Sequence, residues 1–201
     1  VPDTTGLYTR EMFDLTVNGV PTAPGISLTP NPAWTDDALV VSIDTASTDP
    51  NGDPVTYSYE WYVNGTLSAA STTGTLPASA TTRGETWEVV VTPNDGMSDG
   101  PTASASLTIE NTAPALTSVD ITPNPAYFGD TLTCGWTGWS DADGDADASS
   151  VVWTINGVAS STATTLSSGF ISGDTVTCTV TPDDGTDTGT ALSDTITIGN
   201  S

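Results

Sequence analysis

The sequence contains no histidine and no lysine, and Arg10 and Arg83 are its only basic residues. Without histidine there is no histidine general base, no histidine-dependent triad and none of the usual zinc sites. Without lysine there is no Schiff-base chemistry and no Walker-type phosphate loop. Aspartate pairs alone can hydrolyse glycosides, but here the aspartates crowd into loops and the glutamates are few and dispersed. These absences predict a protein that is not an enzyme.

Positive charge is almost absent, so 25 acidic residues give a formal net charge of −23. This charge repels nucleic acids and anionic membrane surfaces, because binding to either depends on Lys and Arg. No apolar run approaches the roughly 18 residues of a membrane span. We therefore expect no nucleic acid partner and no membrane insertion. The chain starts at Val1 without a signal peptide, so export has to be inferred from other features.

Three motifs occur twice, in the same order and at nearly the same spacing. They are TPNPAW at 29–34 and TPNPAY at 122–127, WYVNG at 61–65 and WTING at 153–157, and VTPNDG at 91–96 and VTPDDG at 180–185. The first motif is shifted by 93 residues (122 − 29). This length exceeds one solenoid turn or one propeller blade, and it matches a complete β-sandwich. We predict one repeat over residues 21–112 and a second over residues 113–201.

Within each copy, short runs alternate apolar and polar residues, and Gly, Pro, Asn and Asp separate the runs. Period-two alternation predicts strands with one buried face, and no segment has a sustained helical period. The sequence therefore predicts an all-β chain of two tandem antiparallel β-sandwiches, each with about seven strands. Trp61, Trp87 and Trp153 should lie in the cores, and Trp34 and Tyr127 should plug one end of each sandwich.

Residues 1–20 belong to neither copy. Residues 13–19 resemble the closing segments 106–111 and 194–200, which makes them an extra N-terminal strand. This strand is either the tail of a preceding repeat or a strand donated to a neighbouring molecule. In the second case Phe13, Leu15 and Val17, on one face of the strand, would mediate assembly.

The only two cysteines are Cys134 and Cys178. The repeat aligns them with Val41 and Val89, on inward faces of the strands that flank the Trp strand. Cys…Trp…Cys is the sandwich pattern of an inter-sheet disulfide packed on a buried tryptophan. We predict this bridge, which implies an oxidising location outside the cytoplasm; the alternative is two free thiols in a reducing compartment.

Three segments carry a family resemblance: STDPNGDPVTY at 47–57, YEWYVNG at 59–65 and GDTVTCTVTPDDG at 173–185. Both copies resemble bacterial immunoglobulin-like repeats, related to the polycystic-kidney-disease-type (PKD-type) and cadherin-like repeats of extracellular surface proteins. The resemblance implies an immunoglobulin-like fold, secretion to the surface of a prokaryote, and a place in an array of similar domains. Such domains serve as stalks, adhesins and enzyme spacers alike.

Acidic loops form the candidate metal sites. The second copy carries Asp141, Asp143, Asp145 and Asp147 in one loop and Asp183 and Asp184 in another, and the first copy carries a thinner set at Asp49, Asn51, Asp53 and Asp95. Calcium takes six to eight oxygen ligands, and alternating aspartates can turn several carboxylates onto one ion. We predict calcium as the cofactor. The alternative is that these residues form ordinary Asx turns.

Three functions fit the sequence. The leading hypothesis is a non-catalytic stalk or fibre module, with loops stiffened by calcium, whose partners are neighbouring repeats or copies of itself. The second is a filament subunit joined by exchange of the N-terminal strand. The third is a carbohydrate-binding or adhesin module that stacks a glycan of a cell-surface receptor on Tyr62 or Trp139.

Overall fold

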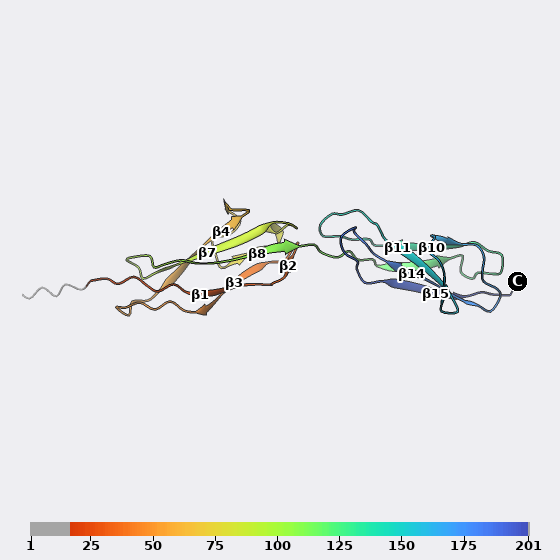
Figure 1. The fold of residues 1–201 in the computed structure, drawn as a ribbon, viewed down its shortest axis with the longest axis horizontal. Coiled ribbons are helices and arrows are strands. Elements are labelled where there is room, and N and C mark those ends of the chain that lie inside the picture. The colour runs from red at the N-terminus through yellow and green to blue at the C-terminus, as the bar shows by residue number, and fades with distance from the viewer. Residues whose placement is uncertain (1–16, 201) are drawn as a thin grey trace, which may run out of the picture.

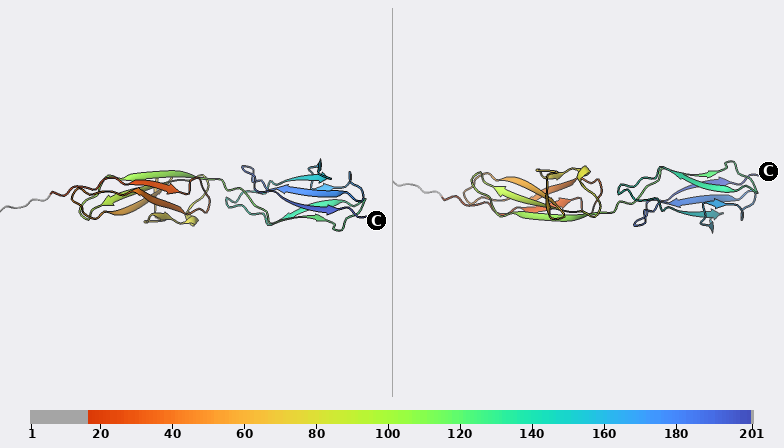
Figure 2. Two further views of the ribbon diagram at one scale, coloured as in Figure 1. Left: turned by 90° about the horizontal axis from the view of Figure 1, so that it is seen from below. Right: turned by 90° about the horizontal axis from the view of Figure 1, so that it is seen from above.

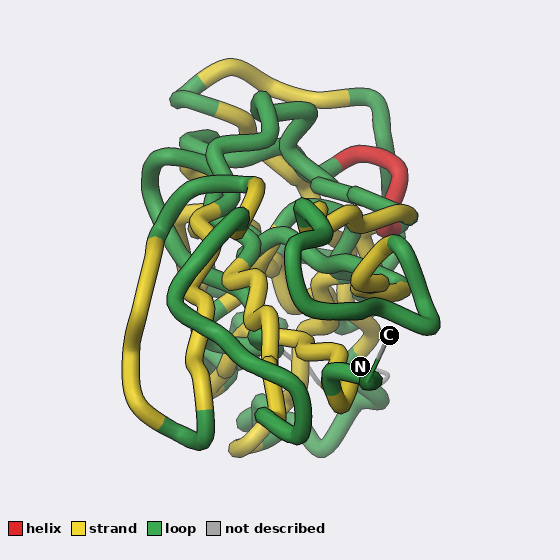
Figure 3. The backbone as a smooth tube through the Cα atoms, turned by 90° about the vertical axis from the view of Figure 1, so that its right-hand side faces the viewer, coloured by secondary structure: helices red, strands yellow, loops and turns green. Residues whose placement is uncertain are grey.

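The computed structural model describes residues 17–200, which form two β-sandwiches lying end to end (Figure 1). The side views show each sandwich as two layers of strands running roughly along the long axis (Figure 2). Figure 3 looks along that axis and superimposes the two sandwiches. Over the described range the only helical segment is the 3-10 turn η1 (Ala78–Ala80), and none is long and apolar enough to cross a bilayer. The predicted all-β fold of two tandem immunoglobulin-like sandwiches is confirmed.

The first sandwich contains β1 to β8. One sheet has the order β1-β3-β6 and the other has the order β2-β8-β7-β4-β5. The strands are β1 (Gly25–Thr29), β2 (Ala33–Trp34), β3 (Leu39–Thr45), β4 (Thr56–Val63), β5 (Thr66–Ser68), β6 (Thr75–Leu76), β7 (Thr86–Asn94) and β8 (Ala103–Glu110).

The second sandwich contains β9 to β15 and repeats this arrangement. Its sheets have the orders β13-β10-β9 and β12-β11-β14-β15. The strands are β9 (Ser118–Thr122), β10 (Leu132–Thr137), β11 (Ser150–Ile155), β12 (Val158–Ser161), β13 (Thr165–Leu166), β14 (Thr175–Thr181) and β15 (Leu192–Thr197). The prediction of purely antiparallel sheets is wrong in one detail, because β2 pairs in parallel with β8.

The Asn-Gly pairs of the two WxxNG motifs form the tightest hairpins. Asn64 and Gly65 have φ values of 50° and 77°, and Asn156 and Gly157 have 50° and 81°. Two consecutive positive φ values are what a two-residue type I′ turn requires, and Asn-Gly is the sequence that adopts it most readily. The motif therefore forms the hairpin between β4 and β5 in the first copy and the hairpin between β11 and β12 in the second.

Each core is built around a tryptophan on an interior strand, β4 in the first sandwich and β11 in the second. Trp61 and Trp153 are fully buried, and each indole Nε1 donates to a backbone oxygen, that of Thr73 and that of Ala163. Trp87 is also buried and packs edge-on against Trp61, with ring centroids 6.4 Å apart. The predicted core positions of all three tryptophans are confirmed.

The prediction that Trp34 and Tyr127 plug the sandwich ends is wrong. These rings remain 42% and 40% exposed, whereas the preceding residues, Ala33 and Ala126, are completely buried. Strand alternation explains the difference, because a small residue enters the core and its neighbour must point outward.

The predicted disulfide is present. Cys134 on β10 and Cys178 on β14 join the two sheets of the second sandwich, with their Cα atoms 6.2 Å apart. At the equivalent positions of the first sandwich, Val89 is fully buried and Val41 packs, partly buried, against the core. The same core positions thus hold a covalent bridge in one copy and two valines in the other.

Removing the bridge should destabilise the second sandwich alone. The two cysteines are 44 residues apart, and in the chain-entropy estimate a loop of this length contributes about 4 kcal/mol. We expect the Cys134→Ala/Cys178→Ala variant to shift one of two unfolding transitions in guanidinium, followed by tryptophan fluorescence. A shift of the first-sandwich transition by the same amount would contradict this assignment.

Candidate functional site

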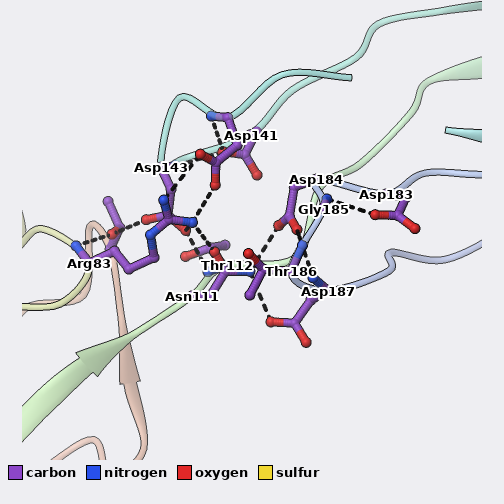
Figure 4. Close-up of polar contacts among 12 residues, drawn as sticks. Arg83, Asn111, Thr112, Asp141, Asp143, Asp183, Asp184, Gly185, Thr186 and Asp187 are labelled. Carbon is purple, nitrogen blue, oxygen red and sulfur yellow. Dashed lines mark hydrogen bonds and ion pairs between the residues drawn. The ribbon is translucent and has the colours of Figure 1, made fainter. Parts of the chain in front are cut away.

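The acidic loops of the second sandwich surround the linker between the two sandwiches. β8 ends at Glu110 and β9 begins at Ser118. The loop between β10 and β11 and the loop between β14 and β15 lie at this end, where the amide of Ala148 donates to the carbonyl of Asp183 at 2.8 Å. Figure 4 shows the linker residues Asn111 and Thr112 between the two groups of aspartates. We call the linker residues Asn111 and Thr112, the aspartates of these two loops and the first-sandwich side chains that contact them the junction.

Asp141 shapes the first loop. Its Oδ1 accepts the backbone amides of Asp143 at 3.0 Å and Asp145 at 2.9 Å. This Asx turn explains the alternating sequence, because one carboxylate holds the backbone of two later residues and frees their side chains for other contacts. The other oxygen of Asp141, Oδ2, is buried and has no hydrogen-bond partner within residues 17–200.

Asp143 ties the second sandwich to the linker and to the first sandwich. Its side chain is 1% exposed. Oδ2 accepts the backbone amide of Thr112 at 2.7 Å, and Oδ1 accepts the hydroxyl of Thr35 from the loop after β2. A buried carboxylate requires such donors, since burying an unpaired charge is costly. This single side chain therefore bridges three segments.

Arg83, between η1 and β7 of the first sandwich, supplies the positive charge. Its guanidinium donates to both oxygens of Asp145 and to Oδ1 of Asn111, and it lies 3.9 Å from Asp143. The fork geometry of arginine suits such two-oxygen contacts. The hydrogen bond to Asp145 raises the pKa of Arg83 further, and the nearby aspartates add to this effect. No other Lys or Arg occurs in the described part of the chain.

Asn111 continues the network to the second acidic loop. Its Nδ2 donates to Asp184 at 2.8 Å and to Asp187 at 2.9 Å. The bond from Asn111 lowers the pKa of Asp184, and the backbone amides of Asp187 and Thr186 lower it further. The linker asparagine therefore receives a hydrogen bond from one sandwich and donates to the other.

The junction has the donor chemistry of a hard-cation site. One oxygen from each of Asp141, Asp143 and Asp145 lies within 4.8 Å of the others. Asp184 and Asp187 stand on the other side of Asn111 (Figure 4). Two predicted ligands are directed elsewhere: Asp147 accepts the indole N–H of Trp136, and Asp183 accepts the amide of Gly185.

The thinner acidic set of the first sandwich has the same local geometry. Asp49 Oδ1 accepts the amides of Asn51 at 2.7 Å and Asp53 at 3.2 Å. Asn18 donates to Asp95 at 3.0 Å, as Asn111 does to Asp184, and this bond lowers the pKa of Asp95. Asn51 stands where the second sandwich has Asp143, and its Oδ1 accepts the amide of Gly19 at 2.6 Å. The cluster that has three carboxylates in the second sandwich therefore has two in the first, Asp49 and Asp53.

The remaining predicted residues make no hydrogen bond of the junction network or lie outside the described range. Tyr62 is on β4, where its hydroxyl donates to Glu60; burial raises its pKa, and Glu60 adds to the effect. Trp139 follows β10, and both rings are half-buried. Val17 is 74% exposed, and Phe13 and Leu15 lie outside the described residues. The stacking and strand-donation roles stay predictions.

Sequence reasoning missed Arg83, Thr35 and Asn111. A signal existed for Asn111, since it follows Asn18 by the same 93 residues (111 − 18) that separate the TPNPA motifs. A signal existed for Arg83 too, because a rare cation in so acidic a chain is expected to find carboxylates. Thr35 offered no signal, since threonine is common throughout the sequence.

No protein-family model and no curated protein sequence matches this chain. Similar solved structures include three multidomain segments. A two-domain fibronectin type-III segment of chicken tenascin is 11% identical, with 90% of this chain and 99% of that chain covered and a TM-score of 0.43. The FN1–FN3 domains of chicken CNTN1 are 11% identical, covering 92% and 70%, with a TM-score of 0.37. The fibronectin(III)-like modules of Clostridium thermocellum CbhA are 16% identical, covering 88% and 95%, with a TM-score of 0.31.

Replacing Arg83 should loosen the junction without unfolding either sandwich. Its side chain is 34% exposed, so we expect Arg83→Ala to change the unfolding free energy of each sandwich by less than about 1 kcal/mol. Small-angle scattering should instead show a broader range of end-to-end lengths. Arg83→Lys, which keeps the charge but loses the fork, should give an intermediate result. A scattering profile unchanged by Arg83→Ala would contradict this role.

The contribution of Asn111 should depend on pH. The pKa of Asp184 in the folded chain lies below its usual value of 3.8. The hydrogen bond from Asn111 therefore makes its full contribution to stability above pH 3.8. The contribution is lost as the pH falls below 3.8 through the lowered folded value. Urea unfolding should therefore show a stability difference between the native chain and Asn111→Ala at pH 6 that shrinks towards pH 2. A difference that is constant over this range would argue against the bond.

Proposed function

We propose that this chain is a non-catalytic spacer, a stalk or fibre module of an extracellular surface protein. The observation that carries the proposal is the junction, where side chains from both sandwiches bind the linker. Thr112 is held by Asp143, and Asn111 is held between Arg83 and Asp184. A linker fixed on both sides limits rotation between the sandwiches, so the pair acts as a stiff rod.

The chemistry of the chain supports a mechanical role. One hollow on the described surface, lined by residues 113–116 and 188–190 and by Leu192, contains no charged residue. The disulfide supports a location in an oxidising compartment outside the cytoplasm. The resemblance to repeats of prokaryotic surface proteins points to the same place.

Calcium at the junction is part of this proposal. The buried Oδ2 of Asp141 has no hydrogen-bond partner and could serve as a cation ligand. The ligand atoms that the three-aspartate cluster offers are carboxylate oxygens, which calcium prefers. The residues that would hold the ion are Asp141, Asp143 and Asp145. A divalent ion would supply charge that Arg83 provides only in part, and it would thereby stiffen the contact between loop and linker.

The spacer role is tested by the distance between the sandwiches. Spin labels at Leu67→Cys on the first sandwich and Val158→Cys on the second occupy exposed strand positions. Pulsed dipolar spectroscopy should give one narrow distance distribution. A control with four Gly-Ser residues inserted after Thr112 should broaden it markedly, because Gly-Ser chains are flexible. A native chain as broad as the insertion variant would refute the stiff rod.

Calcium binding is tested separately, by thermal unfolding of the second sandwich. Calcium at a hundred times its dissociation constant should add about 2.7 kcal/mol of stability. Asp141→Asn should remove most of this gain, and the control Asp183→Asn should keep it, since Asp183 belongs to the β14–β15 turn and not to the three-carboxylate cluster. Unfolding curves that coincide in millimolar calcium and in chelator would rule out the ion.

A further inference from the structure

The first sandwich holds the segment that enters it as the second sandwich holds the linker. Asn18 donates to Asp95 at 3.0 Å, and the backbone amide of Gly19 donates to Oδ1 of Asn51 at 2.6 Å. Nδ2 of Asn51 donates to the carbonyl of Val17 at 3.2 Å. Residues 18 and 19 lie 93 positions before the two linker residues of the junction (111 − 18), which make the matching hydrogen bonds. The first sandwich therefore has the receiving half of a junction.

This receiving half contains a hollow of about 300 Å³, which we call the leading-end hollow. The residues that line it are Asn18, Asn51, Asp53 and Met97. In the repeat, Asn18 and Asp53 correspond to the two residues whose side-chain oxygens bind the guanidinium of Arg83 in the junction. Within residues 17–200, nothing donates a hydrogen bond to the carboxylate of Asp53 or to the amide oxygen of Asn18. The hollow therefore offers the two acceptors of an arginine site, and both are unpaired in this part of the chain.

A buried carboxylate oxygen beside the hollow also favours a positive occupant. Oδ1 of Asp49 accepts the amides of Asn51 and Asp53, while its Oδ2 is buried and has no hydrogen-bond partner within residues 17–200. Asp141 has the same arrangement in the second sandwich, where Arg83 binds the same loop. Burying an uncompensated charge is costly, so a cation held by Asp53 would stabilise this loop as well.

The fourth lining residue favours arginine over a metal ion. Met97 is 76% exposed. It takes the place of Thr186, since Asp95 and Asp184 accept the backbone amides of these two residues. An apolar side chain beside a carboxylate suits an occupant with a charged head on a methylene stem. Arginine fits better than lysine, because its planar fork reaches two acceptors at once.

The described part of this chain has no further arginine at a trailing end, the end of a sandwich where Arg83 lies. Arg83 itself is bound in the junction. At the corresponding position the second sandwich has Ser172, because the next residue, Gly173, donates to the closing segment of its sandwich as Gly84 does in the first. A second copy of residues 17–200 therefore offers no free arginine at either trailing end, and the occupant is expected on a different sandwich.

We propose that the leading-end hollow binds an arginine from the trailing end of another sandwich of this kind, one that precedes Asn18 along the chain. The arginine occupies the position of Arg83, and its guanidinium binds Asp53 and Asn18. The order along the chain follows from residues 18 and 19, which are held as the linker is. The neighbour needs no hydroxyl like that of Thr35, because both polar groups of the Asn51 side chain already bind the entering segment.

This arginine site specifies which sandwich can precede this one. A trailing end with serine, like that at Ser172, leaves the carboxylate of Asp53 without a partner, whereas an end with arginine pairs it. The balance of charge is closer than in the junction, because one guanidinium faces the two carboxylates of this cluster and not three. The inference rests on the contacts of the junction, and it holds whether or not the two sandwiches form a stiff rod.

A tandem fusion tests the site with a known neighbour. Residues 1–110 are joined to residues 18–201, so that Asn18 follows Glu110 as Asn111 does in the native chain. Spin labels at Leu67→Cys in both copies of the first sandwich should give a distance distribution as narrow as that across the native junction. Arg83→Ala in the added copy should broaden this distribution, and Arg83→Lys, which keeps the charge without the fork, should broaden it less.

Variants of the hollow complete this test. Asp53→Asn in the copy that receives the added sandwich should broaden the distribution as Arg83→Ala does. Asp99→Asn, which changes an exposed aspartate at the same end, should leave it narrow. Distributions of equal width with and without Arg83 would overturn the proposal, as would equal effects of the two aspartate variants. The native junction carries its own labels, so this failure would leave the spacer role standing.

An arginine titration tests the site in the native chain. Nα-acetylarginine amide, added at constant ionic strength in the presence of a chelator, should shift the side-chain amide signals of Asn18 in NMR spectra to saturation. The signals of Asn111 should stay in place, because its oxygen already binds Arg83. Nα-acetyllysine amide, which has the same charge without the fork, should shift the Asn18 signals much less.

Three results of this titration would overturn the proposal. The Asn18 signals could fail to respond, or they could respond equally to the two compounds. A response that appears only in Arg10→Ala would show that the chain's own second arginine fills the hollow, and not an arginine of a neighbouring sandwich.

Discussion

The junction depends on holding several carboxylates close together with too little positive charge to balance them. Arg83 alone faces Asp143 and Asp145, and Asp184 and Asp187 gather on the other side of Asn111. The structure reduces the repulsion by distributing neutral donors: backbone amides, a threonine hydroxyl and a side-chain amide each satisfy one carboxylate oxygen. Oδ2 of Asp141 is buried without a donor, and so is Oδ2 of Asp49 at the equivalent place in the first sandwich. The position of the linker is a consequence of this arrangement, since the donors come from both sandwiches.

The overall fold was predictable because its signals are local and occur twice. Alternating residues around Trp61 and Trp153 predict half-buried strands in both copies, and the repeat aligns Cys134 and Cys178 with positions that valine fills in the first core. A disulfide between them follows, since only inward residues on facing sheets come this close. The errors arose at short elements. The two-residue strand β2 has too few residues to show a period, so neither its parallel pairing nor the burial of Ala33 could be read from alternation.

The site could be predicted only in part. The shape of its loops is determined by the local sequence, but the partners of its carboxylates come from distant parts of the chain. The loop 141–147 shows its Asx-turn pattern in its own sequence, and its aspartates were found. Which carboxylate faces which partner depends on how the two sandwiches meet. Arg83 lies 62 residues before Asp145, and no pattern within either repeat connects them. Asp147 shows the opposite error, since it belongs to the run of aspartates but bonds to Trp136 on its own sandwich.

The parallel pairing of β2 with β8 bears on how the first sandwich responds to tension. β2 lies near the start of this sandwich, and β8 leads directly into the linker, with Ala33 opposite Ile109 and Trp34 opposite Glu110. When the chain is pulled from both sides, parallel neighbours slide along one another, and their hydrogen bonds stretch together in shear instead of opening one by one. In the second sandwich, Tyr127 and Gly199 pair in parallel at the corresponding place. Each sandwich therefore has one pair of parallel segments that is loaded in shear, and this pair includes the segment by which the chain leaves the sandwich.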